Sequence, residues 1–151
     1  MPTDLCKANA TSNIVSRSNC TGPNAYSVIT TADAGAGSLR QAILSANANP
    51  NFSTIRFNLP SNNKAIALSS ALPAITAPIL IDGSTQPNYN ASDNTTFVQV
   101  SGPITGEIGN GLLFNGMSQG SSVIGLKLSN FPNYGIFTQV ENVTMKNVNV
   151  K

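Results

Sequence analysis

The 151 residues fit one domain, and their eight basic and six acidic side chains give a net charge of only +2. So little charge excludes a surface built to attract nucleic acid or anionic lipid, and no apolar run reaches the roughly 18 residues of a membrane span. Histidine and tryptophan are absent, which removes the commonest general base, the commonest metal ligand and the ring that stacks best on sugars. About a third of the residues are Asn, Ser or Thr, so we expect an uncharged surface of amides and hydroxyls and no cofactor or metal.

Residues 1–25 form a polar N-terminal segment without strand alternation or helical period. It contains both cysteines, Cys6 and Cys20, and a disulfide between them would stabilise the segment by roughly 3 kcal/mol. The alternative is a pair of free buried thiols. A disulfide implies an oxidising compartment, whereas the start of the chain lacks the charged and apolar regions of a signal peptide. We therefore expect a secreted or cell-surface protein whose signal sequence is missing from this chain.

The segment 30–43, TTADAGAGSLRQAI, contains the only helical spacing among short strands. Ser38 follows a Gly-rich turn and is the expected N-cap. Apolar residues then recur on one helical face at Leu39, Ala42, Ile43 and Ala46. The helix should end near 47–50, and because a lone helix of about ten residues is marginal in water, we expect it to cap the first coil of the following strands. Arg40 should point to solvent or pair with Asp33.

Nine short runs have strand composition and are separated by Gly, Pro, Asn, Asp or Ser. They are 25–30, 54–58, 64–68, 78–81, 97–100, 111–114, 123–128, 135–137 and 143–150. Three runs end in an apolar residue, a small polar residue and Gly, which predicts a turn with positive φ at each of Gly83, Gly102 and Gly116.

Two pairs of segments repeat at a nearly constant distance: 110–113 matches 134–137, and 123–128 matches 145–150. Offsets of roughly 22 to 24 residues are typical of a solenoid, whose coils bury their apolar faces only by stacking on one another. The sequence therefore predicts an all-β fold, a parallel β-helix, that spans residues 26–151 as one domain. A β-sandwich, with strands about 8 to 12 residues apart, is the alternative.

The segments TTADAGAGSLRQAILSANANP, TIRFNLP, ALSSALPAITAPILIDGSTQP, NGLLF and SSVIGLKLSNF, in this order, carry a family likeness. Together they resemble the N-terminal part of bacterial secreted and cell-surface right-handed parallel β-helix proteins of the pectin-lyase-like superfamily. The likeness covers about residues 26–150. It implies a right-handed coil, an N-terminal helical cap and a surface or secreted setting. Function stays open, because the superfamily includes polysaccharide lyases and hydrolases as well as adhesins and structural stalks.

An enzyme would need carboxylates that converge on the substrate. The acidic residues are instead dispersed along the chain: Asp4, Asp33, Asp82, Asp93, Glu107 and Glu141. Asp82 is the best placed, at a strand end, although Asp-Gly is first of all a turn. The paired Asp and Gly-His-Gly by which pectin-cleaving hydrolases resemble one another cannot be present without histidine. A lyase that uses Arg or Lys as the base remains open.

A binding role asks instead for exposed aromatic, amide and acidic side chains on one face. The candidate ligand-binding residues are Asp82, Tyr89, Asp93 and Tyr134. The segment 86–90 is expected to be an outward loop that forms one wall of a groove. Phe137 is expected in the core, because it follows Gly135 and Ile136 in a strand.

The chain stops at residues 148–151 in the middle of a repeat, with nothing in the sequence to cover the last coil. We expect either that the natural protein continues or that another subunit packs on this end. The interpretation favoured by these observations is a non-catalytic adhesin or structural stalk that contacts a polysaccharide or a protein and self-associates through its C-terminal coil. The alternative is a fragment of a polysaccharide lyase or glycoside hydrolase.

Overall fold

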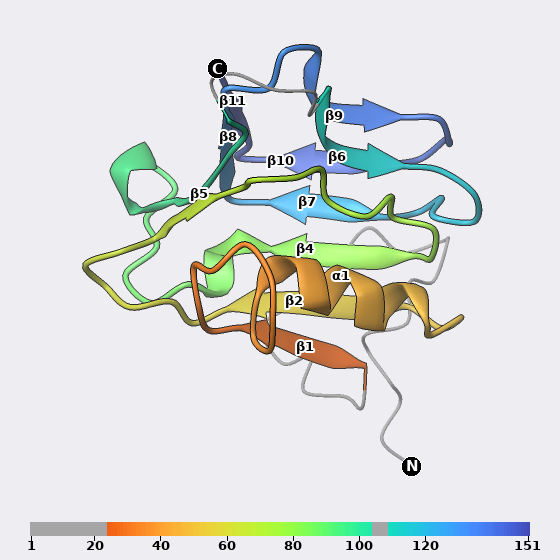
Figure 1. Ribbon diagram of the computed structural model, residues 1–151, viewed down its shortest axis with the longest axis horizontal. Helices are drawn as coiled ribbons and strands as arrows, with labels where there is room; N and C mark the ends of the chain where they lie inside the picture. The colour runs from red at the N-terminus through yellow and green to blue at the C-terminus, as the bar shows by residue number, and fades with distance from the viewer. Residues whose placement is uncertain (1–23, 104–108) are drawn as a thin grey trace.

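The computed structural model describes residues 24–103 and 109–151, so Cys6 and Cys20 lie outside the described residues. The described part is mostly β-structure with one α-helix (Figure 1). In chain order the elements are β1 (Ala25–Val28), α1 (Leu39–Asn47), β2 (Ser53–Phe57), β3 (Ala65–Ala67), β4 (Ile79–Asp82), η2 (Gly83–Thr85), η3 (Asn94–Thr96), β5 (Val98–Ser101), β6 (Asn110–Phe114), β7 (Ser122–Ile124), β8 (Leu126–Ser129), β9 (Tyr134–Thr138), β10 (Thr144–Lys146) and β11 (Asn149–Val150).

The strands form three parallel sheets. Sheet A has the order β1-β2-β4-β7-β10, sheet B has the order β3-β5-β8-β11, and sheet C pairs β6 with β9. In each sheet the spatial order is the chain order, so the chain returns to the same sheet one position further along (Figure 1). Every strand pair within the described ranges is parallel, which excludes the antiparallel β-sandwich there.

The register confirms both repeats expected from the sequence. Asn110 lies beside Tyr134, 24 residues later, in sheet C. Val123 lies beside Met145 in sheet A, and Leu128 lies beside Val150 in sheet B, both 22 residues later. The matched sequence segments are therefore hydrogen-bonded neighbours, because equivalent side chains fill equivalent positions in successive strands.

The corners between sheets correct two of the three predicted turns. Gly116 has a φ of +60°, as expected, whereas Gly83 and Gly102 are not in the positive-φ region. These two glycines are required by close backbone approach instead: a Cβ at Gly83 would collide with the carbonyl oxygen of Gly125, and one at Gly102 would lie 2.6 Å from that of Asn130. The spacing of the glycines was visible in the sequence, but its physical cause lies in the neighbouring coil.

Positive-φ residues also divide two predicted strands. Gly125, with φ +64°, separates β7 from β8, and Asn147, with φ +51°, lies between β10 and β11. A single left-handed residue thus turns the chain from sheet A into sheet B. The same two sheets are joined after β4 by a much longer connection, residues 83–97, so the length of this corner varies while the strand register is kept.

The predicted helix is present, with Ser38 as its N-cap. The Ser38 side chain accepts a hydrogen bond from the backbone N–H of Gln41 and donates one to the carbonyl of Gly35. The buried helical face consists of the four predicted residues, Leu39, Ala42, Ile43 and Ala46. The helix lies against β1 and β2, at the opposite end of the stack from β9, β10 and β11 (Figure 1).

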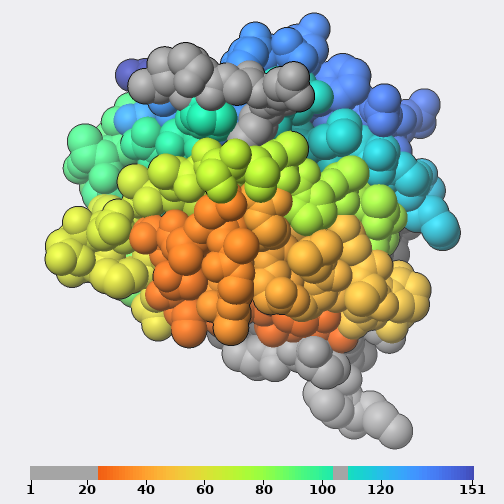
Figure 2. Space-filling model, in the orientation of Figure 1, coloured from red at the N-terminus to blue at the C-terminus, as the bar shows by residue number. Residues whose placement is uncertain are grey.

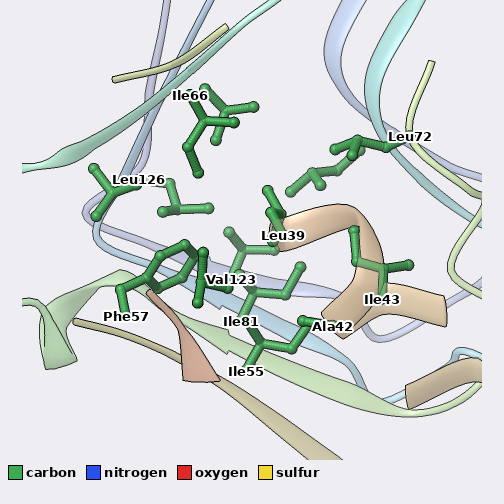
Figure 3. Packing of buried hydrophobic residues seen from close by; sticks show 14 of the residues in the cluster. Leu39, Ala42, Ile43, Ile55, Phe57, Ile66, Leu72, Ile81, Val123 and Leu126 are labelled. Atoms are coloured by element: carbon green, nitrogen blue, oxygen red, sulfur yellow. The ribbon is translucent and has the colours of Figure 1, made fainter. Parts of the chain in front are cut away.

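Apolar ladders fill the space between the sheets (Figure 3). In sheet A, Ile55, Ile81 and Val123 occupy one register position in three successive strands and are fully buried. The face of α1 packs on this ladder, because Leu39 and Ile43 are also fully buried in the same cluster. The helix therefore belongs to the core rather than lying loosely on the surface.

Replacing both Leu39 and Ile43 with Asp should unseat α1, since two charges cannot stay in an apolar core, at a cost of about 4 kcal/mol or more. We expect a large fall in melting temperature by circular dichroism and aggregation by light scattering. Leu44→Asp is the matched control, because Leu44 is 45% exposed on the same helix. Unchanged melting of the double variant would contradict the assignment of α1 to the core.

Candidate functional site

One end of the stack is closed by an ion pair and its hydrogen bonds. Arg40 Nη2 lies 2.8 Å from Asp33 Oδ1, as one of the two sequence alternatives predicted. The same guanidinium donates to the carbonyls of Ser70 and Ala71, and Asp33 accepts from the N–H and hydroxyl of Ser69. The helix is thereby tied to the segment that follows β3, and Figure 2 shows the orange surface around α1 lying directly against the yellow-green surface around residue 70.

Asn47, the last residue of α1, closes the edge of sheet C. Its side-chain amide donates to the carbonyl of Ala74 at 2.7 Å and accepts from the N–H of Thr76 at 2.9 Å. Ile75, between them, forms its backbone hydrogen bonds on the other side, with Leu113 and Asn115. The Asn47 amide thus takes the place of a neighbouring parallel strand. Nothing in sequence spacing signals this role, because it depends on where the helix ends relative to a distant segment.

The electrostatics of this closed end depend on Asp33. Partial burial alone would raise the pKa of Asp33, but the hydrogen bonds from Arg40 and Ser69 and the charge of Arg40 outweigh it and hold the pKa below its ordinary value. The ionised carboxylate is therefore favoured in the folded state. The ion pair is a structural feature, since each of its oxygens already has a protein partner.

Asp82 and Asp93 also serve the local backbone. Asp82 is 3% exposed and accepts from the N–H and hydroxyl of Ser84, which corrects its assignment as a ligand-binding candidate because its carboxylate is buried in a turn. Asp93 is exposed, but it caps η3 in the same way, and hydrogen bonds from Thr95 lower its pKa. Asp82 and Asp93 are therefore the N-caps of η2 and η3.

The segment 86–90 is not the outward loop that we expected. Gln86 is 2% exposed, and its side-chain amide both accepts from the N–H and donates to the carbonyl of Leu59. Tyr89 is half-buried and stacks on Phe97, with ring centroids 5.0 Å apart. Its ring also covers Gly125, where a Cβ would lie 2.7 Å from the tyrosine Cε2. Tyr89 is thus largely committed to packing, because the loop folds back onto the coil.

Tyr134 is the sequence candidate that remains available to a ligand. Its side chain is 58% exposed on β9 and stacks on Phe137, with ring centroids 5.4 Å apart and an interplanar angle of 18°. The expectation that Phe137 lies in the core is wrong. Phe137 is half-buried and outside the core cluster, whereas its neighbour Ile136 packs against that cluster. The alternation of the strand places consecutive residues on opposite faces and turns Phe137 outward.

The end of the stack opposite α1 has an uncovered apolar edge. The sheet A ladder of Ile55, Ile81 and Val123 continues to Met145, and the sheet B ladder continues in the same way to Val150. Both of these last residues are 53% exposed, whereas the preceding members of their ladders are fully buried. They occupy core positions without a following strand among the described residues, so apolar surface is exposed at this edge.

The described residues offer no clustered chemistry. Within residues 24–103 and 109–151, no three Asp, Glu, His or Cys side chains come together as a metal site would require. Asp33, Asp82 and Asp93 lie in three separate local networks, and Glu141 is exposed on its own loop. What the arrangement supplies is contact surface: the Tyr134–Phe137 pair and the apolar edge at Met145 and Val150.

The lowered pKa of Asp33 predicts a dependence of stability on pH. A carboxyl whose pKa is lower in the folded state stabilises the fold above its unfolded value, near 3.8, and this contribution is lost as the pH falls through the folded pKa. Asp33→Asn should therefore lower the melting temperature at pH 7 and flatten its decline below about pH 4. Thermal melts from pH 7 to about 2 test this. The control is Glu141→Gln, on an exposed carboxylate, and parallel curves for Asp33→Asn and wild type would contradict the prediction.

No helix among the described residues is both long and apolar enough to cross a membrane. None of the protein-family models compared with this chain matches it, and no curated protein is significantly similar to it. Proposals for its function therefore depend on the residues and geometry described above.

Proposed function

We propose that this chain is a non-catalytic module of a right-handed parallel β-helix, secreted or at a bacterial cell surface, that acts as an adhesin or structural stalk. The observation that carries the proposal is the ordered return of the chain to each of three parallel sheets. Parallel connections between strands of one sheet are almost always right-handed. The resemblance of the sequence to pectin-lyase-like β-helix proteins supports the same architecture and setting.

In this proposal α1 is the cap of the first coil. It follows β1 in the position that strands of sheets B and C take in later coils. Its apolar face covers the open core, and Arg40 and Asn47 supply hydrogen bonds to backbone groups at the ends of sheets B and C. A cap of this kind prevents further strands from adding at this end, since the edge already has partners.

The non-catalytic part of the proposal is supported by the roles of the described carboxylates. Asp33, Asp82 and Asp93 are held by neighbouring side chains and backbone N–H groups, in three separate places. A glycosidase needs two carboxyl groups on either side of one bond, about 5 to 10 Å apart. The alternative, a polysaccharide lyase or glycoside hydrolase fragment, would need the catalytic groups to come from elsewhere.

The test is a glycan-array binding assay run beside two activity assays on acidic and neutral polysaccharides. One activity assay measures new reducing ends, and the other measures the ultraviolet absorbance of unsaturated products. We expect binding to at least one glycan or matrix protein and no product above that of heat-denatured protein. Product formation that increases with protein concentration would establish the enzyme alternative instead.

A second role, self-association, is favoured by the exposed core positions Met145 and Val150. Since Arg40, Asn47 and α1 block the other end, a second copy has only the β9-β10-β11 edge available for stacking. Association through the same edge of both copies is isologous and closes as a dimer, whereas head-to-tail stacking would give a filament. We therefore propose a closed dimer rather than a filament.

Sedimentation or light scattering over a range of concentrations tests the dimer. The wild-type chain should dimerise, and the variant Met145→Lys with Val150→Lys should be monomeric, because two buried like-charged pairs would form across the interface. Met117→Lys is the matched control, since Met117 is 76% exposed elsewhere. A wild-type monomer at high concentration, or a filament, would contradict the closed dimer.

A further inference from the structure

We propose that the outer face of sheet C is a binding site for a neutral sugar, centred on the stacked pair Tyr134 and Phe137. The inference rests on the proposed surface-contact function and names its ligand class and its residues. Tyr134 has the largest exposed fraction of the tyrosines that the structure leaves outside the packed interior, and Phe137 extends its ring surface. We call these two residues the aromatic pair.

The position of the aromatic pair depends on a break in the strand. Residues three apart in a regular strand lie on opposite faces, so Tyr134 and Phe137 would not normally meet. Between them is Gly135, where a Cβ would lie 2.5 Å from Val150 Cγ1. The equivalent residue of β6, Gly111, has its open side against the carbonyl oxygen of Gly135. Two glycines packed together thus let β9 bend, and the bend brings both rings to one face.

The surroundings of the aromatic pair are uncharged. Between Lys127 and Glu141 the chain contains no charged residue. The polar residues beside the pair are amides and hydroxyls: Asn110 is the register partner of Tyr134, and Asn133, Thr138 and Gln139 are exposed on either side. Amides and hydroxyls can both donate and accept, as the hydroxyls of a sugar do.

This composition decides between ligand classes. An acidic polysaccharide or a phosphate would call for Lys or Arg beside the rings, and the face has none. A protein partner buries about 800 Å² on each side in a standard interface, much more than two rings. A pyranose needs only one ring face for its apolar C–H surface, with hydrogen-bonding groups around the edge. The aromatic pair, with amides and hydroxyls beside it, fits a neutral hexose or pentose unit of a glycan.

The experiment titrates the full chain with three neutral hexasaccharides, of β-1,4-glucose, β-1,4-xylose and β-1,4-mannose, and with oligogalacturonate as the acidic comparison. Calorimetry and saturation-transfer NMR report binding, and the NMR identifies which protons of the sugar contact the protein. We expect at least one neutral oligosaccharide to bind more tightly than oligogalacturonate, with its ring C–H protons showing the strongest transfer. Stronger binding of oligogalacturonate would overturn the proposal.

Three variants locate the site. Tyr134→Ala and Phe137→Ala should each weaken binding by about tenfold or more, which is about 1.4 kcal/mol, whereas Tyr134→Phe keeps the ring and should retain most of it. Met117→Ala is the control for an exposed apolar side chain away from the pair. Circular dichroism melts establish that each variant is folded. Equal affinity of folded Tyr134→Ala and wild type would overturn the site.

The outcomes separate this site from the proposed function as a whole. If a neutral glycan binds and the alanine variants bind it equally well, the contact function stands and the aromatic pair is the wrong site. If no oligosaccharide binds but Tyr134→Ala abolishes the dimer, the pair contacts a second copy and the sugar site is overturned. Loss of sugar binding in both alanine variants, with dimerisation unchanged, supports the site.

Discussion

The structure depends on one constraint: each parallel sheet must end in a strand whose outer backbone groups have partners. At the start of the stack these partners are side chains. The amide of Asn47 bonds on both sides of Ile75 as a strand would, and the guanidinium of Arg40 binds two carbonyls after β3. Further along, the amide of Gln86 forms the same two-sided contact with Leu59. A chain rich in amides can therefore end or interrupt its sheets without additional strands.

The same use of polar groups explains the character of the surface. Asp33, Asp82 and Asp93 serve a helix and two short turns, so the few charges that the chain has are absorbed by its architecture. What remains exposed is neutral, and aromatic rings such as Tyr134 become the strongest available contacts. A protein of this composition should recognise partners through shape, stacking and hydrogen bonds, with little dependence on ionic strength.

Much of the fold could be predicted from the sequence, because it depends on local periodicity. The helix and its buried face followed from the spacing of Leu39 and Ile43, and the repeat of 110–113 at 134–137 gave the pairing of β6 with β9. The errors concern contacts between coils. Gly83 is dictated by a carbonyl 42 residues later, and Gln86 is buried because of Leu59. Neither distance is readable without the stacking order. Phe137 was misplaced because its strand bends at Gly135.

The two kinds of corner between sheets A and B also bear on how such a chain can change. The turn at Gly125 is a single residue enclosed by Ser84 and the ring of Tyr89, whereas the connection of residues 83–97 contains two short turns and an exposed tip. Because β4 and β5 keep their register on either side of this longer connection, its tip is free to vary in length and sequence. Insertions near residues 90–92 would thus add new surface to one side of the molecule while the stacked strands stay as they are, which makes this corner the natural place for divergence or for grafting a foreign peptide.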